Sequence, residues 1–296
     1  YSADSVFDSA TISGGKATLD SAGMTTLSVS TAVVSSTLTA ANATLDSATI
    51  SGGTATLDSA DITTLRVTDT ITWPETGKVK LGYNAGLNNQ GGAGTSAVAI
   101  GEYAGQDSQG FGTVAVGDQA GLLRQSNYAV AVGSTSGWND QGSNAVAIGF
   151  QAGRYSQGAT AVGLGYYAGH TNQSEDAIAI GEEAARYRQG ADAVAIGYHS
   201  GMWDQGDYCI AIGPQAGEDS QGYSSIAIGH QAGELQSSSY SIAIGPLAGQ
   251  RDQGYGGIAI GRTSGKDYQS NYGISIGWEA AQDSQGENAI AIGQDA

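Results

Sequence analysis

Glycine returns every sixteen residues through most of this 296-residue chain, at thirteen positions from Gly101 to Gly293 without a slip. Each of these glycines closes a run such as Ala145 to Gly149, in which small and aliphatic residues alternate. A second small residue follows four residues later, and a glutamine stands four residues beyond it in nearly every copy. A fixed period of this kind is the sequence signature of a repeat architecture.

One repeat unit predicts one coil of a solenoid. Val146 and Ile148 alternate with small residues, which indicates a short β-strand. Gly149 and Gly153 supply tight corners, and the equivalents of Gln157 would form a ladder of side-chain amides between coils. We expect successive coils to stack about 4.8 Å apart, as neighbouring strands do. The predicted fold is an all-β parallel β-roll, or β-solenoid, with sixteen-residue coils.

The alternation also bears on which face of the strand is covered. We expect Val146, Ile148 and their equivalents to fill the interior, which leaves a flat alanine and glycine face outside. Each coil would then gain roughly 4–6 kcal/mol from about two buried aliphatics and a few alanines, against at least ~16 kcal/mol of backbone entropy. We therefore infer a homo-oligomer whose copies cover the flat face. A monomeric solenoid with capped ends stays open, because stacking alone stabilises many repeat arrays.

The chain divides into three regions by composition. Residues 1–73 are rich in Ser and Thr and repeat with a period of 38, so that the run from Asp8 returns from Asp46. Their sparse apolar residues predict an extended β-stranded stalk in which several chains intertwine, with a disordered stalk as the alternative. Residues 74–96 form a junction and first coil, and residues 97–296 form the regular array.

Charge and composition exclude several classes of function. The net charge is −17 with only 11 Lys and Arg, so nucleic acid and anionic membranes are poor partners. No run of 18 apolar residues exists, so we expect no membrane insertion. His170, His199 and His230 lie on separate coils and are expected at the surface, and Glu182 and Glu183 are adjacent and do not face each other across a cleft. We expect no catalytic, cofactor or metal site and no enzyme activity.

Aromatic residues at the variable positions of the coils are the candidate contacts for a partner. They are Trp138, Tyr155, Tyr187, Trp203 and Tyr268. Exposed Tyr and Trp on a rigid frame suit stacking against sugar rings or protein receptors. The alternative is that these aromatics pad contacts between subunits or stack on one another. A second set directly precedes the strand: Tyr128, Tyr208, Tyr240 and Tyr272.

The runs from Ala177 to Ala185 and from Ser241 to Gly249 resemble the head repeat of trimeric autotransporter adhesins. Similar repeats with a Gln-Gly step occur in fibre proteins of phages and large DNA viruses. The resemblance covers residues 79–296, and the unit here is two residues longer than the usual adhesin unit. It implies a left-handed parallel β-roll, three rolls packed side by side, and a head that binds host surface molecules.

Repeat and resemblance together predict a structural fibre segment of a virus or cell surface. We expect an extracellular homotrimer whose β-roll shaft or head mediates attachment to a host-surface glycan or protein receptor. A fibre-borne polysaccharide depolymerase is one alternative, and it would place acidic residues in a cleft that breaks the period. A purely structural extracellular filament is another. An ice-binding solenoid would need a column of Thr, which the array lacks.

Overall fold

The computed structural model describes residues 78–88 and 97–296, and before them the backbone of five strands between Leu27 and Asp61. The chain divides into two compact units, Tyr1–Thr72 and Trp73–Ala296. The described residues contain strands and turns but no helix, and so no helix that could cross a membrane.

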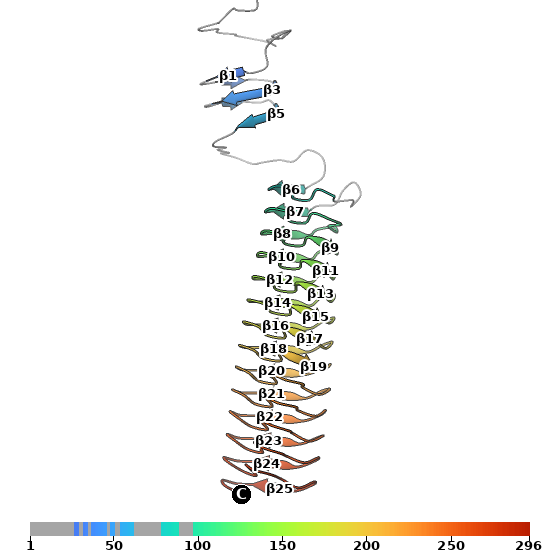
Figure 1. The fold of residues 1–296 in the computed structure, drawn as a ribbon, viewed down its shortest axis with the longest axis vertical. Coiled ribbons are helices and arrows are strands. Elements are labelled where there is room, and N and C mark those ends of the chain that lie inside the picture. The colour runs from blue at the N-terminus through green and yellow to red at the C-terminus, as the bar shows by residue number, and fades with distance from the viewer. Residues whose placement is uncertain are drawn as a thin grey trace, which may run out of the picture. The chain divides into compact units, whose positions relative to one another are not determined.

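The second unit is a parallel β-solenoid, which confirms the predicted fold class (Figure 1). Its first sheet has fourteen strands, and each pairs in parallel with the equivalent strand of the next coil. Val146, for example, lies beside Val130 on one side and Val162 on the other, sixteen residues away in each direction. The strands of this sheet are β6 (Lys78–Leu81), β7 (Ala97–Ile100), β8 (Val114–Val116), β10 (Val130–Val132), β12 (Val146–Ile148), β14 (Val162–Leu164), β16 (Ile178–Ile180), β18 (Val194–Ile196), β20 (Ile210–Ile212), β21 (Ile226–Ile228), β22 (Ile242–Ile244), β23 (Ile258–Ile260), β24 (Ile274–Ile276) and β25 (Ile290–Ile292).

A second, narrower sheet forms the other wall of each coil. Its strands are β9 (Leu123–Gln125), β11 (Asn139–Gln141), β13 (Tyr155–Gln157), β15 (Thr171–Gln173), β17 (Tyr187–Gln189) and β19 (Trp203–Gln205). Single bridges such as Asp107 to Leu123 and Trp203 to Asp219 continue the same pairing beyond it at both ends. At the start of the solenoid, Val79 pairs with Val98 with an offset of nineteen residues, so three extra residues lie in the connection from Asn88 to Ala97.

The interior of the coils contradicts one prediction. The alanines of the strand point inward, and Ala145 and Ala147 are fully buried. Val146 is only half-buried, and Ile148 is 37% exposed on the outer face. The expectation that the aliphatics fill the interior and the small residues face outward was therefore wrong. The two walls enclose a space that holds alanine methyls and glutamine amides, and it has no room for a layer of larger side chains.

The glutamine ladder is present as predicted. The Gln157 side chain is 2% exposed, and its Nε2 donates to Gln173 Oε1 at 3.0 Å and to the carbonyl oxygen of Val146 at 2.9 Å. Equivalent bonds join Gln125 to Gln141 at 3.0 Å and recur along the coils. Each buried amide thus ties its own coil to the next, and it satisfies strand carbonyls that would otherwise face an apolar interior.

The two glycines of the unit differ in whether another residue can replace them. Gly149 has φ of 127°, and a Cβ there would lie 2.3 Å from the carbonyl oxygen of Gly165 in the next coil. No other residue occupies this position in the array, because the obstacle is backbone. A Cβ on Gly153 would meet only the end of the Gln157 side chain. Ala185 stands at the equivalent place with φ of 47°.

Three further corners of each coil are left-handed without glycine. In the coil that begins at Ala145 they are Gln151, Ser156 and Thr160, with φ of 57°, 54° and 57°. This conformation costs roughly 1–2 kcal/mol for a residue with a Cβ. Bonds to the preceding coil offset part of the cost, since the amide of Thr160 donates to Ser143 at 2.8 Å. The residue type varies at these corners, so the sequence carried no signal for them.

The first unit contains two small parallel sheets among its described strands. The strands are β1 (Leu27–Val29), β2 (Ala32–Val34), β3 (Thr37–Leu45), β4 (Ala48–Ile50) and β5 (Thr54–Asp61). β1, β3 and β5 form one sheet, and β2 pairs with β4. Leu27 lies beside Ala43, sixteen residues on, so these strands pair within one chain at a spacing like that of the second unit. The predicted stalk covers residues 1–73, and the part of it outside these five strands lies outside the described residues. The intertwining of the stalk with other chains stays a prediction.

The amide ladder is interrupted at Ser237, where the equivalent residue of neighbouring coils is Gln. Ser237 Oγ bonds to the carbonyl oxygen of Gly233 at 3.2 Å and does not reach the next coil. Two buried atoms near this gap, Gln253 Oε1 and Ser241 Oγ, have no hydrogen-bond partner. An unsatisfied buried polar group costs about 1–3 kcal/mol.

We expect Ser237→Gln to raise the free energy of unfolding by about 1–3 kcal/mol, because the new amide would donate to Gln253 Oε1 and accept from Gln221. Urea unfolding followed by circular dichroism measures the change. Ser237→Ala is the matched control and should be slightly less stable than the natural protein. A Ser237→Gln protein no more stable than the natural one would contradict this account of the gap.

Candidate functional site

Five rings on successive coils form one column beside the second sheet, which we call the aromatic column. Its members are Trp138, Tyr155, His170, Tyr187 and Trp203, with successive ring centroids 5.5, 5.5, 6.4 and 4.2 Å apart. The rings meet because coils stack at one strand spacing, so a ring at the same or an adjacent position of the unit reaches the ring on the next coil. Four of the five predicted contact residues are thereby brought together.

Two arginines pack against the rings of the column. The Arg154 guanidinium lies 5.5 Å from the Trp138 ring and 4.8 Å from the Tyr155 ring. The Arg186 guanidinium lies 5.0 Å from the Tyr187 ring and also bonds to Glu183 at 2.9 Å. Such cation–π contacts contribute about 0.5–2 kcal/mol each. The column therefore combines ring–ring contacts with cation–π contacts from two arginines.

His170 lies at the centre of the aromatic column and is only 9% exposed, which corrects the prediction that it is a surface residue. Its ring nitrogens lie 2.7 Å from Thr171 Oγ1 and 3.1 Å from Gln151 Oε1. Burial, with the neighbouring charges of Arg154 and Arg186, lowers the pKa of His170 from 6.5 to about 4. The imidazole is therefore neutral at pH 7.

The predicted contact residues differ in how far they reach solvent. Trp203, at one end of the aromatic column, is 41% exposed. Trp138, Tyr155 and Tyr187 are half-buried against their neighbours. Tyr268 lies four coils beyond Trp203, is 63% exposed, and has no ring contact among the described residues. Trp203 and Tyr268 thus present the most ring surface, on separate parts of the solenoid.

A second aromatic series occupies the corner directly before the strands of the first sheet. Tyr208, Tyr240 and Tyr272 were noticed in the sequence, but Tyr223 and Tyr255 were missed. The missed pair fills the intervening coils, and the five rings follow one another at 5.3–5.6 Å. Tyr223 and Tyr255 stand one residue earlier in the unit than the others, so a search of single columns passes over them.

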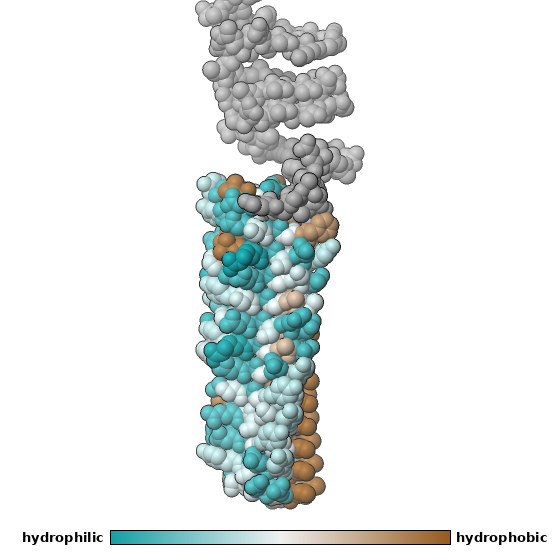
Figure 2. Space-filling view, turned by 90° about the vertical axis from the view of Figure 1, so that its right-hand side faces the viewer, coloured by the Kyte–Doolittle hydropathy of each residue, from teal (hydrophilic) through white to brown (hydrophobic). Residues whose placement is uncertain are grey.

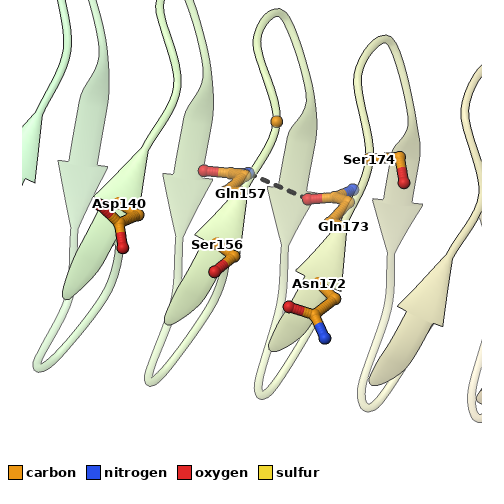
Figure 3. A pocket seen from close by; sticks show the side chains of 7 residues that line it. Asp140, Ser156, Gln157, Asn172, Gln173 and Ser174 are labelled. Atoms are coloured by element: carbon orange, nitrogen blue, oxygen red, sulfur yellow. Dashed lines mark hydrogen bonds between the residues drawn. The ribbon is translucent and has the colours of Figure 1, made fainter.

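Shallow polar grooves cross the outer face of the second sheet. One of about 330 Å³ is lined by residues of three neighbouring coils, among them Asp140, Ser156 and Asn172 (Figure 3). These three side chains occupy equivalent places on β11, β13 and β15, outside the buried bond from Gln157 to Gln173. A groove of about 420 Å³ continues the same lining toward Arg188 and Asp204.

The carboxylates of these grooves are held by arginines. Asp140 is paired with Arg124, and Asp204 is paired with Arg188. The hydrogen bond from each arginine is the main reason why the pKa of each aspartate is lowered. A glycosidase acid needs the opposite shift, a raised carboxyl pKa. In the part of the chain that the structure describes, no group of three His, Cys, Asp or Glu side chains is placed to hold a metal ion.

We expect His170→Gln to flatten the loss of stability in mild acid. The folded protein keeps His170 neutral down to about pH 4, whereas the unfolded chain binds a proton near pH 6.5. The stabilisation from neutral His170 is therefore full above pH 6.5 and falls as the pH drops from 6.5 to 4. Unfolding free energies of both proteins across pH 4–7.5 measure the difference. Equal slopes in this window would contradict the placement of His170.

Comparison with known proteins found no matching family model, no similar curated protein and no similar solved structure. The resemblance to adhesin head repeats therefore depends on the repeat motif itself, and the function is argued from the surfaces of the solenoid.

Proposed function

We propose that this chain is one strand of an extracellular homotrimeric fibre, on a virus or cell surface, whose β-solenoid shaft or head mediates attachment. The observation that carries the proposal is the outer face of the first sheet. Its fourteen strands each direct two side chains outward, and all of them are Val, Ile or Leu. We call this surface the aliphatic face.

The aliphatic face is too apolar and too continuous for a surface that stays in water. Ile148, Ile212 and Ile244 are each 37% exposed even with neighbouring coils in place. Figure 2 shows hydrophobic residues gathered along one edge of the lower solenoid beside a largely hydrophilic surface. Contiguous apolar patches much larger than a few hundred Å² mark interfaces on soluble proteins.

A second and a third copy of the chain are the partners that fit this face best. The face continues from β6 to β25 with one unchanging pattern, and a matching straight, periodic, apolar surface exists on another copy. Covering the exposed third of each aliphatic side chain would gain roughly 0.5–1 kcal/mol. Over the whole face this exceeds the roughly 4–15 kcal/mol lost on association. The number three comes from the resemblance to trimeric adhesins.

Attachment is supported by what remains uncovered in such an assembly. The aromatic column and the polar grooves lie on the side of the second sheet, away from the aliphatic face. A shared apolar centre would therefore leave Trp203 and its neighbours outward on each strand of the fibre. Because the backbone frame is regular, the variable residues of the corners decide what such a fibre contacts.

We expect the natural protein to have three times the 29.7 kDa mass of the chain in solution. Ile180→Lys together with Ile212→Lys should yield folded monomers, because two unpaired ammonium groups cannot be buried in the interface. Ser156→Lys, on the groove side, is the matched control and should stay trimeric. Light scattering after size exclusion measures the masses. A folded natural protein of 29.7 kDa at micromolar concentration would overturn the trimer.

We expect Trp203→Ala to weaken attachment without changing the oligomeric state. Trp203 stacks on Tyr187 at 4.2 Å and supplies the most exposed ring of the column. The assay is retention of purified fibre on arrays of glycans and of cell-surface proteins, with release of sugar fragments monitored in parallel. Retention equal to that of the natural protein would exclude this ring as a contact. Release of fragments would favour a depolymerase.

A further inference from the structure

Five consecutive coils place one exposed tyrosine each at the same corner, in a series that we call the tyrosine ladder. Its members are Tyr208, Tyr223, Tyr240, Tyr255 and Tyr272, each between 42% and 52% exposed. Neighbouring rings meet edge to face, with interplanar angles of 65–74°. The stacking holds each ring in place and leaves about half of it open to solvent.

The corner that carries the tyrosine ladder is almost free of charge. Its other residues are glycines, serines and an asparagine, and the exception is Asp207 at its beginning. In the two coils directly before the ladder the same corner is acidic, with Glu175, Asp176 and Asp192. Glu287 follows in the coil after the ladder. On a chain of net charge −17, this is a neutral strip with carboxylates at both ends.

Hydrogen-bonding groups lie between the rings. The Asn271 side chain is exposed and accepts a bond from the amide of Tyr255 through Oδ1 at 2.9 Å. Ser224 directly follows Tyr223, and Ser239 directly precedes Tyr240. Rings interleaved with small polar side chains offer apolar contact and adaptable hydrogen bonding together.

The size of the tyrosine ladder decides between classes of partner. An aromatic side chain buries 150–250 Å² when fully covered, so five half-exposed rings offer roughly 400–600 Å². A standard protein interface needs about 800 Å² on each partner. The strip is also straight and one side chain wide. It suits a long, narrow ligand better than the surface of a globular protein.

We propose that the tyrosine ladder binds a neutral, extended polysaccharide lying along the solenoid axis. The C–H faces of sugar rings pack on the electron-rich faces of aromatic rings. Coils advance by about 4.8 Å each, and an extended β-linked glycan advances by roughly the same distance per sugar. Each coil therefore meets one sugar, and because successive sugars of a β-1,4-linked chain are turned over, every second coil meets an equivalent part of the ligand. This deepens the proposed attachment function by naming a ligand class, although the binding itself does not require the trimer.

The absence of charge argues for a neutral glycan. An acidic polysaccharide would face Asp207 and Glu287 at the ends of the strip and the negative field of the whole chain. A cationic ligand would find no carboxylate between Tyr208 and Tyr272 at this corner. A proline-rich peptide is also long and narrow, but such peptides dock in aromatic-lined grooves, and the ladder is an exposed corner.

The test uses the full chain and a variant with Tyr223, Tyr240 and Tyr255 each replaced by Ser. Ser224 stands at the position equivalent to Tyr240 in the preceding coil, and Ser239 stands at the position equivalent to Tyr223 and Tyr255, so the fold should tolerate serine at all three places. Tyr268→Ser is the matched control, because Tyr268 is more exposed than any ladder member and Ser156 stands at the equivalent place of another coil. Circular dichroism and light scattering check fold and mass.

Isothermal titration calorimetry with cellohexaose and chitohexaose, both neutral, measures the affinity, with hyaluronan hexasaccharide and a proline-rich peptide as comparisons. We expect one neutral hexaose to bind the natural protein and the Tyr268→Ser control equally, and the triple variant at least tenfold more weakly. Tighter binding of hyaluronan or the peptide would overturn the proposal, as would binding of neither neutral hexaose.

Two further outcomes separate this inference from the fibre proposal. If the triple variant alone loses the trimer, the ladder is a contact between chains and the inference fails while the trimer stands. If the natural protein is a monomer that still binds a neutral hexaose through the ladder, the trimer fails and the inference stands.

Discussion

The narrowness of the space between the two walls of each coil governs the rest of this solenoid. The side chains buried in the described coils are small ones, chiefly alanine methyls such as those of Ala145 and Ala147, together with glutamine amides such as that of Gln157. Larger aliphatics have no place inside, so they stand on the outer face of the first sheet. The apolar surface that an ordinary domain hides within itself is here presented outward, and the chain gains from burying it only by associating.

The amides inside the coils complement this thin interior. An alanine core offers little hydrophobic stabilisation, because each methyl buries little area. The glutamines instead link neighbouring coils through buried hydrogen bonds, except at the Ser237 gap, and the low local dielectric strengthens these bonds. Because these bonds lie inside the coils, the variable residues on the outside are not needed to hold the coils together. Rings, arginines and acidic residues can change from coil to coil without disturbing the frame, and this is how the aromatic column and the tyrosine ladder come to occupy different coils.

Much of the fold followed from the spacing of residues. The sixteen-residue period predicted the register, since Val146 lies beside Val130 and Val162, and the glutamine column predicted the buried ladder. The orientation of the strand could not be predicted in the same way. An alternating strand fits either face inward, and the usual preference for burying the larger residues favoured the wrong one for Val146 and Ile148. Which face of the strand points inward depends on the distance between the two walls of the coil, and the sequence of a single repeat unit does not reveal that distance.

The candidate sites were only partly visible in the sequence for a related reason. Trp138 stands one residue earlier in its coil than Tyr155 does, yet their rings touch at 5.5 Å. Side chains reach across neighbouring columns, whereas a comparison of equivalent positions treats each column alone. His170 looked like one more variable surface residue. Its burial among the rings of adjacent coils, and after that the charges of Arg154 and Arg186, keep it neutral.

The coils stack along the axis of the solenoid (Figure 1), and hydrogen bonds such as that from the amide of Val146 to the carbonyl oxygen of Ala161 join each coil to the next. A force that pulls the end of the solenoid along its axis therefore separates one coil at a time. It does not break the hydrogen bonds of a whole sheet at once. Each coil that peels away releases sixteen residues, about 53–58 Å of extended chain, in exchange for about 4.8 Å of stacked height. Under tension each coil that peels away would lengthen about elevenfold before the chain itself is strained, and the solenoid would recover its length by restacking.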